Sequence, residues 1–300
     1  MRKIVVSGNC QMAVIIATLQ LIFPLDKVVA LNFILDPQGD KLEMYRLELC
    51  DADIWLVISR DWSSRIYGQL NINNLKIISF PNLEFRGFHP DLIYILEPNS
   101  SNTSPVYQSS LIACGYKIGL TQNETYSCFN EIVFGNLGFH DSWKQSIDEL
   151  KWRFDNSDLN SHFLNYIRHC QRLWVFMYTI NHPHVEAIIW LAKLISLEIG
   201  ATKNVLDMDM DMDIVLPELL NSVIWPIYPS IANSIGLTGS LNFFWSTKVR
   251  TLNEFINIKY IELDQNYNDK NDIKSAPNFI DLIKVEQSMT SFLGKKNESL

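Results

Sequence analysis

One cysteine follows a short apolar run at a point where the chain could present it for chemistry. The run at residues 3–7 leads into Gly8 and Asn9, Cys10 comes next, and a helical pattern begins at Gln11. A strand that turns sharply into a helix places the next side chain at the carboxyl edge of a sheet, where open α/β folds bind ligands. The helix N-terminus favours a thiolate, so we expect a lowered thiol pKa. Cys10 is therefore a candidate nucleophile, although free cysteine is also often buried in cores.

The turn around Cys10 could also hold a negatively charged group. Backbone N–H groups at the first turn of a helix bind phosphates and oxyanions. Gly8 would allow a tight turn, and the side-chain amides of Asn9 and Gln11 could add donors. The arrangement resembles the nucleophile-bearing turn of esterases, with cysteine in place of serine. We therefore expect Gly8, Asn9 and Gln11 to take part in ligand binding.

A histidine follows a later apolar run in a similar way. The segment 82–91 comes directly after a strand pattern at 76–80, so we expect it at the same sheet edge as Cys10. His89 could act as a base, because an unperturbed imidazole has a pKa of ~6.5. Asp91 could orient that imidazole or cap the segment that follows. The alternative is that His-Pro-Asp is only a favourable turn sequence.

A third polar turn contains Asn181, His182 and Pro183. It lies between an apolar run at 173–178, which predicts a fifth strand, and a long helical pattern at 185–199. Asn181 could cap that helix with Pro183 in its first turn, which would leave His182 to face the site. A helix cap with an exposed histidine is the alternative. The argument for one site rests on the recurrence of the strand-turn-helix pattern at three polar turns.

The elements that must position these residues alternate along the first part of the chain. Short apolar runs predict strands at 3–7, 28–35, 54–59 and 76–80, and helical patterns lie at 11–21, 41–50 and 63–70. Strands that alternate with helices form parallel sheets through right-handed crossovers. Near-continuous apolar runs are typical of strands covered on both faces. We therefore predict an α/β fold with a short, Rossmann-like parallel sheet.

Helical patterns predominate after about residue 100, at 106–115, 121–135, 141–154 and 158–172. Residues 215–260 are apolar and aromatic, and a polar stretch rich in Asn, Asp, Lys and Ser begins near residue 266. Such a stretch is typical of a partly mobile tail. We expect one α/β domain at 1–265, with a strand-helix half at 1–100 and a mainly helical half at 101–265, followed by a tail at 266–300.

The composition narrows the class of protein and partner. A formal net charge of −8 argues against a nucleic-acid partner but allows a local basic pocket for one phosphorylated ligand. We find no signal-peptide pattern and no apolar stretch near the ~18 residues of a membrane span. Five cysteines without CxxC spacing indicate reduced thiols, with no disulfide framework or zinc site. We expect a cytoplasmic protein and no bound metal.

These motifs occur in an order that resembles the WcbI family of polysaccharide biosynthesis enzymes. The resemblance covers roughly residues 3–250 and is carried by four short motifs, Gly8-Asn9-Cys10-Gln11, Pro81 to Asp91, Asn181-His182-Pro183, and Tyr228-Pro229 with Leu237. It implies a coenzyme A-dependent acetyltransferase that modifies a sugar of a capsular or exopolysaccharide. It also implies a nucleophile arrangement similar to that of SGNH hydrolases, with Cys10 in place of serine. Cys10, Gln11 and His89 match best, and His182 less closely.

Two routes for acetyl transfer follow from this resemblance. Cys10, activated by His89, could take the acetyl group from acetyl-CoA and pass it to a sugar hydroxyl. Alternatively, His89 could activate the hydroxyl directly while Cys10 only lines the thiol pocket. The phosphates of coenzyme A also require cations. The candidates near predicted strand ends or an aromatic cluster are Arg60, Arg65, Arg86, Lys248 and Arg250.

The alternating repeat from Asp207 to Asp213 needs its own interpretation. Four carboxylates on one face of a strand could bind a divalent cation, as in nucleotide-sugar glycosyltransferases. Asp is unfavourable in strands, so an exposed loop is the main prediction. His140, His162 and His169 have helical surroundings and no metal-ligand spacing, which predicts structural or surface roles. Besides the acetyltransferase, an acyl-ester hydrolase, a non-catalytic nucleotide- or sugar-binding protein of a glycan locus, and a glycosyltransferase remain alternatives.

Overall fold

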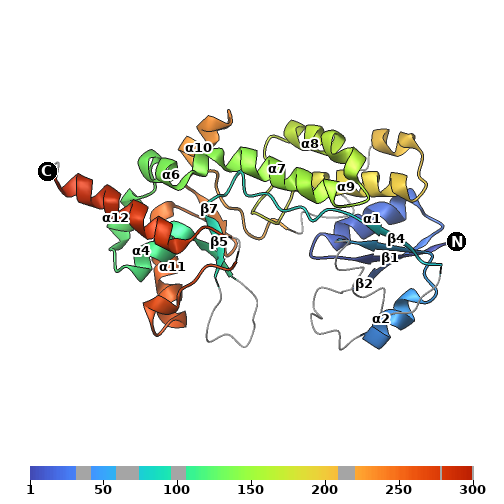
Figure 1. Ribbon diagram of the computed structural model, residues 1–300, viewed down its shortest axis with the longest axis horizontal. Helices are drawn as coiled ribbons and strands as arrows, with labels where there is room; N and C mark the ends of the chain where they lie inside the picture. Colours follow the sequence, from blue (N-terminus) through green and yellow to red (C-terminus); the bar gives the residue numbers. More distant parts are fainter. Residues whose placement is uncertain (32–41, 59–73, 96–105, 209–219, 278, 299–300) are drawn as a thin grey trace. The chain divides into compact units, whose positions relative to one another are not determined.

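The computed structural model describes residues 1–31, 42–58, 74–95, 106–208, 220–277 and 279–298 (Figure 1). The chain forms two compact units, each built from two stretches of sequence. The first unit comprises Met1–Glu84 and Ile147–Asn221, and the second comprises Phe85–Ser146 and Ser222–Leu300. Among the described residues, no helix combines the length and apolar character needed to cross a bilayer.

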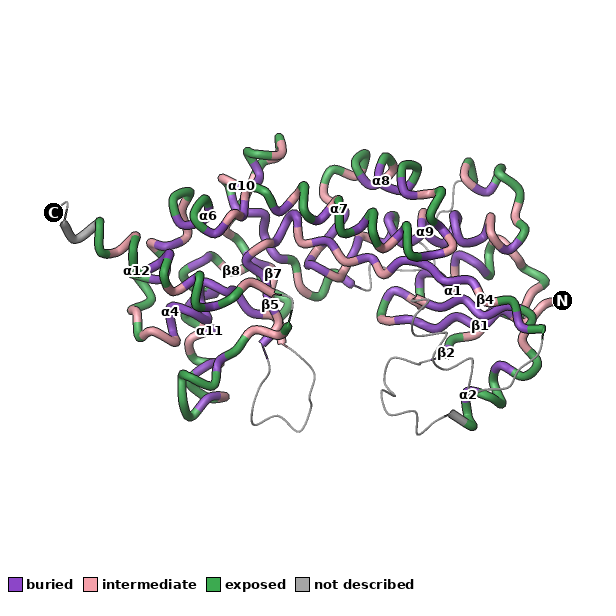
Figure 2. Tube along the Cα trace, viewed as in Figure 1, coloured by how far each residue is buried: buried purple, intermediate pink, exposed green. Residues whose placement is uncertain are grey.

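A four-stranded parallel sheet forms the centre of the first unit. Its strands are β1 (Lys3–Ser7), β2 (Lys27–Leu31), β3 (Ile54–Val57) and β4 (Lys76–Ser79), in the order β2-β1-β3-β4. β1 and β3 are buried along nearly their whole length (Figure 2), as expected for strands covered on both faces. The predicted α/β fold with a short parallel sheet is confirmed.

Helices cover the two faces of this sheet (Figure 1). On one face, Tyr45 and Leu49 of α2 (Leu42–Leu49) pack with Val5, Trp55 and other buried apolar side chains of the strands. On the other face lies α1 (Met12–Ile22), which packs in turn against α9 (Val185–Glu198). α9 is buried on nearly all sides, which explains its almost continuous apolar sequence.

The remaining helices of the first unit include α8 (Phe163–Arg172), which packs against α9, and most of α7 (Ser142–Asp155). Short 3₁₀ turns occur at Asn160–His162 and Lys203–Asp207. The predicted helix at 63–70 and the end of the second predicted strand lie outside the described residues.

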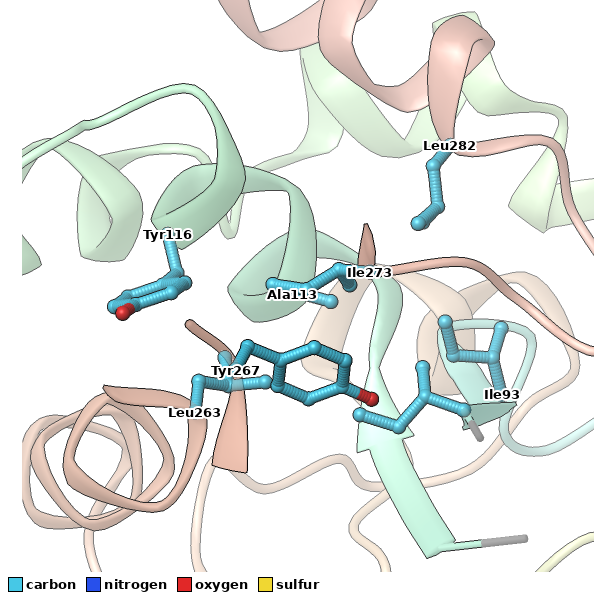
Figure 3. Close-up of a cluster of buried hydrophobic side chains, with 8 residues drawn as sticks. Ile93, Ala113, Tyr116, Leu263, Tyr267, Ile273 and Leu282 are labelled. Carbon is cyan, nitrogen blue, oxygen red and sulfur yellow. The ribbon is translucent and has the colours of Figure 1, made fainter. Parts of the chain in front are cut away.

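The second unit combines two antiparallel strand pairs with helices. β5 (Leu92–Ile95) pairs with β6 (Val106–Ser109), and β7 (Phe243–Trp245) pairs with β8 (Lys248–Arg250). Its helices are α4 (Ser110–Lys117), α5 (Gln122–Ser127), α6 (Glu131–Leu137), α10 (Pro229–Ser234), α11 (Leu252–Asn266) and α12 (Leu282–Glu298). A core cluster joins β5, α4, α11 and the start of α12, with Tyr116, Leu263 and Leu282 among its members (Figure 3).

Three predictions about the second half of the chain differ from the structure. The segment predicted as a helix at 106–115 begins as strand β6, and its helix starts only at Ser110. The predicted helix at 121–135 is interrupted at Asn130, whose side chain caps α6 by accepting hydrogen bonds from two backbone N–H groups. The expected tail at 266–300 contains α12, where Val285 and Met289 are fully buried.

The predicted strand at 173–178 is also wrong. Trp174 has a φ of 62°, in the left-handed region, which breaks the extended backbone. Met177 pairs only through an isolated bridge to Pro183. The apolar side chains of Phe176 and Met177 are buried. The side chains of this segment are therefore buried as in a strand, but its backbone is not extended. The turn that contains Asn181 follows the segment and leads into α9.

Candidate functional site

Cys10 lies just beyond the carboxyl end of β1, where the order of the sheet changes direction. The chain passes from β1 to β2 on one side and returns to β3 on the other side of β1. Ligands of open α/β sheets bind at this type of topological switch point. A Cβ added at Gly8 would lie 2.9 Å from Cγ of Met12, so glycine permits the tight connection between β1 and α1.

The two amide side chains that flank Cys10 tie this turn to distant parts of the first unit. Asn9 accepts a hydrogen bond from the backbone N–H of Gln11 at 3.0 Å and donates one to Oδ1 of Asn82 at 2.8 Å. Gln11 is fully buried, and its Nε2 donates to the carbonyls of Leu83 at 2.9 Å and Asn181 at 3.2 Å. Both side chains therefore fix the geometry around Cys10.

The thiol of Cys10 is accessible, but it is not poised as a thiolate. Cys10 is one of two exposed cysteines; the other is Cys50. Protein atoms around the sulfur remove part of its hydration, and this raises the thiol pKa more than a backbone hydrogen bond at Cys10 lowers it. The predicted lowering of this pKa is therefore wrong, because desolvation disfavours the charged form more strongly. A thiol of this kind needs a base before it can act as a nucleophile.

His182 belongs to the same unit as Cys10 and lies in the turn that Gln11 holds. Burial of the half-buried imidazole lowers the pKa of His182, while a hydrogen bond with the Leu220 backbone opposes that shift. The ring is therefore neutral at pH 7, the form that accepts a proton. The helix cap differs from the prediction, since the N-cap of α9 is His184 and not Asn181. The Cys10 and His182 turns are joined through the side chain of Gln11.

His89 and Asp91 lie in the second unit, which begins at Phe85, whereas Asn82 and Leu83 of the same sequence motif belong to the first unit. His89 is buried, and its Nδ1 lies 3.4 Å from the carbonyl oxygen of Pro226. The neighbouring Gly87 has no room for a side chain, since a Cβ would lie 2.6 Å from the Phe85 ring.

Asp91 is fully buried and anchors the start of α4. Its carboxylate accepts hydrogen bonds from Ser110 Oγ at 2.7 Å, from Leu111 N at 3.0 Å, and from the hydroxyl of Tyr228 at 2.7 Å. Burial raises the pKa of Asp91 more than these hydrogen bonds lower it. Asp91 therefore contacts the first turn of α4, whose N-cap is Ser109, and it links two of the sequence motifs through Tyr228.

The candidate cations have different surroundings. Arg60 and Arg65 lie outside the described residues. The Arg86 guanidinium stacks on the ring of Phe279 at 4.0 Å, and Lys248 is exposed in β8. Among the described residues, no group of His, Cys, Asp or Glu side chains could hold a metal ion. Residues 209–213 of the acidic repeat lie outside the described residues.

Comparison with known proteins identifies the family. The sequence profile of the family described as "Polysaccharide biosynthesis enzyme WcbI" matches residues 3–204. The chain belongs to the WcbI family. Its members are described as enzymes of polysaccharide biosynthesis, which confirms the resemblance expected from the ordered motifs.

A solved WcbI structure shares this fold. The TM-score is 0.70 at 16% sequence identity, over 96% of this chain and 98% of the other. That structure is described as the native protein without a disulfide bond between coenzyme A and one of its cysteines. No curated protein matches the sequence.

Proposed function

We propose that this protein is a coenzyme A-dependent O-acetyltransferase that modifies a sugar of a capsular or exopolysaccharide. The observation that carries the proposal is the accessible thiol of Cys10 at the switch point of the parallel sheet. Membership in a family of polysaccharide biosynthesis enzymes supports a sugar as acceptor. The structural relative supports the donor, because its description names coenzyme A together with one of its cysteines.

In the covalent route, a histidine removes the proton of Cys10 and the sulfur attacks the acetyl carbonyl carbon of acetyl-CoA. The oxyanion collapses, the bond to the coenzyme A sulfur breaks, and that thiolate takes a proton. A sugar hydroxyl, deprotonated by a histidine, then attacks the Cys10 thioester, which forms the sugar ester and restores the thiol. Exchange between two thioesters is nearly isoenergetic. Backbone N–H donors at the turn would stabilise each oxyanion by ~3 kcal/mol per donor.

In the direct route, the histidine deprotonates the sugar hydroxyl, which attacks acetyl-CoA without a covalent intermediate. Cys10 then only lines the pocket of the coenzyme A sulfur. The neutral imidazole of His182 suits the base in either route. We also propose His89 and Asp91 as catalytic residues, because of the sequence motif that contains them. Gly8, Asn9 and Gln11 are proposed to line the donor site, with Arg60, Arg86 and Lys248 as proposed phosphate partners.

Titration with coenzyme A tests the proposal directly. Calorimetry should show saturable binding, and no binding at millimolar coenzyme A would contradict the proposed donor. Treatment with coenzyme A disulfide should form a mixed disulfide in the wild type and in Cys50→Ser but not in Cys10→Ser. Cys50 is the matched control because it is the other exposed cysteine.

The Cys10→Ser variant distinguishes the covalent route from the direct route. Mass spectrometry of protein mixed with acetyl-CoA should show an acetylated Cys10 peptide if the route is covalent. An active Cys10→Ser variant without any acetyl-enzyme supports the direct route, in which His182→Ala abolishes transfer. Acyl-ester turnover without coenzyme A would instead support the hydrolase.

A further inference from the structure

A concave site lies on the first unit, between helices α8 and α9. It is a cavity of about 440 Å³, within the range of small-ligand sites, and none of its lining residues belongs to the Cys10 turn. Arg168 and Arg172 line it from α8. They are four residues apart, which places them on one face of the helix. Both side chains are exposed.

The cavity is rich in hydrogen-bond donors and positive charge. Among the residues that the structure describes, no acidic side chain lines the cavity, and neither Arg168 nor Arg172 forms an ion pair. The side chains of Ser161 and Asn165 add polar groups at its wall. In a protein with a net charge of −8, two guanidinium groups that line one cavity without an acidic partner in the described part of the chain favour an anionic ligand. The planar guanidinium matches carboxylate and phosphate oxygens in a bidentate geometry.

A flat ring pair forms part of the same wall. The imidazole of His169 stacks on the indole of Trp190, with centroids 4.0 Å apart and planes at 2°. Trp190 Nε1 donates to Oδ1 of Asn165 at 3.1 Å, which fixes the indole. His169 Nε2 is buried and has no hydrogen-bond partner among the described atoms. Such a wall offers a ligand a flat apolar surface.

Apolar surface continues beside the arginines. Leu164 lines the cavity and is 62% exposed. A sugar ring has apolar C–H faces and polar hydroxyl edges, so it can use this surface together with the surrounding donors. A simple inorganic anion would use the arginines alone.

We propose that the α8–α9 cavity, defined by Ser161, Leu164, Asn165, Arg168, His169, Arg172 and Trp190, binds a sugar that carries a carboxylate or a phosphate group. This site is separate from the proposed acetyl-transfer site, and its occupation does not require Cys10. In a family of polysaccharide biosynthesis enzymes, an anionic sugar unit of the glycan or a sugar phosphate supplies this chemistry.

Calorimetry with four probes tests the proposal: glucuronate, glucose 1-phosphate, glucose and inorganic phosphate. At least one of the two anionic sugars should bind, and which one binds tells whether the oxyanion is a carboxylate or a phosphate. Glucose should bind at least tenfold more weakly, because it lacks the charged contact to the arginines. Inorganic phosphate should also bind more weakly than glucose 1-phosphate. Equal affinity for glucose would overturn the anionic part of the proposal, and equal affinity for phosphate would overturn the sugar part.

The double variant Arg168→Gln/Arg172→Gln should weaken the anionic sugar at least tenfold. The control Lys144→Gln/Lys203→Gln removes two exposed positive charges elsewhere and should bind like the wild type. An unchanged affinity in the arginine variant would overturn the proposal. Cys10→Ser should also bind like the wild type, so this result is independent of acetyl transfer.

The imidazole of His169 gives a second readout. In the free protein, burial and the charges of Lys193 and Arg172 lower its pKa to about 4. A bound oxyanion offsets those cations, so NMR titration in the presence of the anionic sugar should show a higher pKa for His169. The His169→Gln variant assigns the signal. A pKa that does not change at saturating ligand would contradict binding at this wall.

Discussion

Gln11 donates a hydrogen bond from Nε2 to the carbonyl of Asn181, 170 residues away in the sequence. The same nitrogen donates to the carbonyl of Leu83. One buried amide thus holds together the turn that presents Cys10, the connection that follows β4 and the turn that contains His182. The proposed chemistry at Cys10 depends on this side chain without requiring it to touch a substrate.

Gln11→Leu should lower the free energy of unfolding by about 1–3 kcal/mol, because two carbonyl groups lose their donor in a buried environment. Gln20→Leu is the matched control, since Gln20 lies in the helix that Gln11 caps, is exposed, and within the described residues makes one longer hydrogen bond of 3.4 Å to the Val28 carbonyl. Its effect should stay within about 0.5 kcal/mol. Urea unfolding measures both. Equal effects of the two variants would show that the Gln11 bonds do not stabilise the turn.

Alkylation of Cys10 should be slow at neutral pH and accelerate as the pH rises. Desolvation raises the pKa of this thiol, so the reactive thiolate forms only at alkaline pH. The rate of labelling by iodoacetamide, followed by mass spectrometry of the Cys10 peptide, should still be increasing at pH 9. A rate that reaches a plateau below pH 8 would mean that the helix N-terminus outweighs desolvation.

Gly87→Ala should destabilise the second unit by about 1–3 kcal/mol through overpacking. A Cβ at this position would lie 2.6 Å from the Phe85 ring and 2.9 Å from the Trp143 backbone. Gly135→Ala is the control, because the nearest atom to its Cβ would be 4.0 Å away and alanine favours the helix α6. It should be neutral or stabilising by thermal unfolding. Similar losses for both variants would argue against close packing at Gly87.

Acidification should destabilise the protein partly through His169. Its pKa is lowered to about 4 in the folded chain, against ~6.5 in an unfolded one, so the unfolded chain binds more protons between these values. The stability of the wild type should therefore fall as pH decreases from 6.5 toward 4. In His169→Gln this fall should be smaller, while the difference between the two proteins stays constant above pH 7.5. Urea unfolding at several pH values measures it, and parallel curves over the whole range would contradict the assignment.

The sheet of the first unit could be predicted because its signal is local. Each of β1 to β4 is a short apolar run, and its neighbours along the chain are helical or turn-forming. The apolar run at 173–178 carries the same local signal without becoming a strand. Its backbone is decided by the left-handed conformation of Trp174 and by the pairing of Met177 with Pro183. Neither feature is expressed in the hydrophobic pattern.

The candidate site could be predicted only in part, for a related reason. The position of Cys10 after β1 follows from the strand-turn-helix pattern, and the structure confirms that placement. The raised thiol pKa depends on which atoms surround the sulfur. The roles of Gln11 and Asp91 depend on partners that lie about 20 to 170 residues away. The α8–α9 cavity has no sequence motif, because a pair of arginines on one helix face is usually only solvated surface.

The packing of α9 against α1 has a consequence for synthesis of the chain. α1 emerges early from the ribosome, but the helix that covers its outer face ends only at Glu198. At ~5–20 residues per second, the nascent chain therefore carries an uncovered apolar helix for roughly ten seconds or more. Ribosome-bound fragments that end before α9 should thus recruit chaperones at α1, and crosslinks between chaperones and α1 should disappear once α9 has emerged from the ribosome.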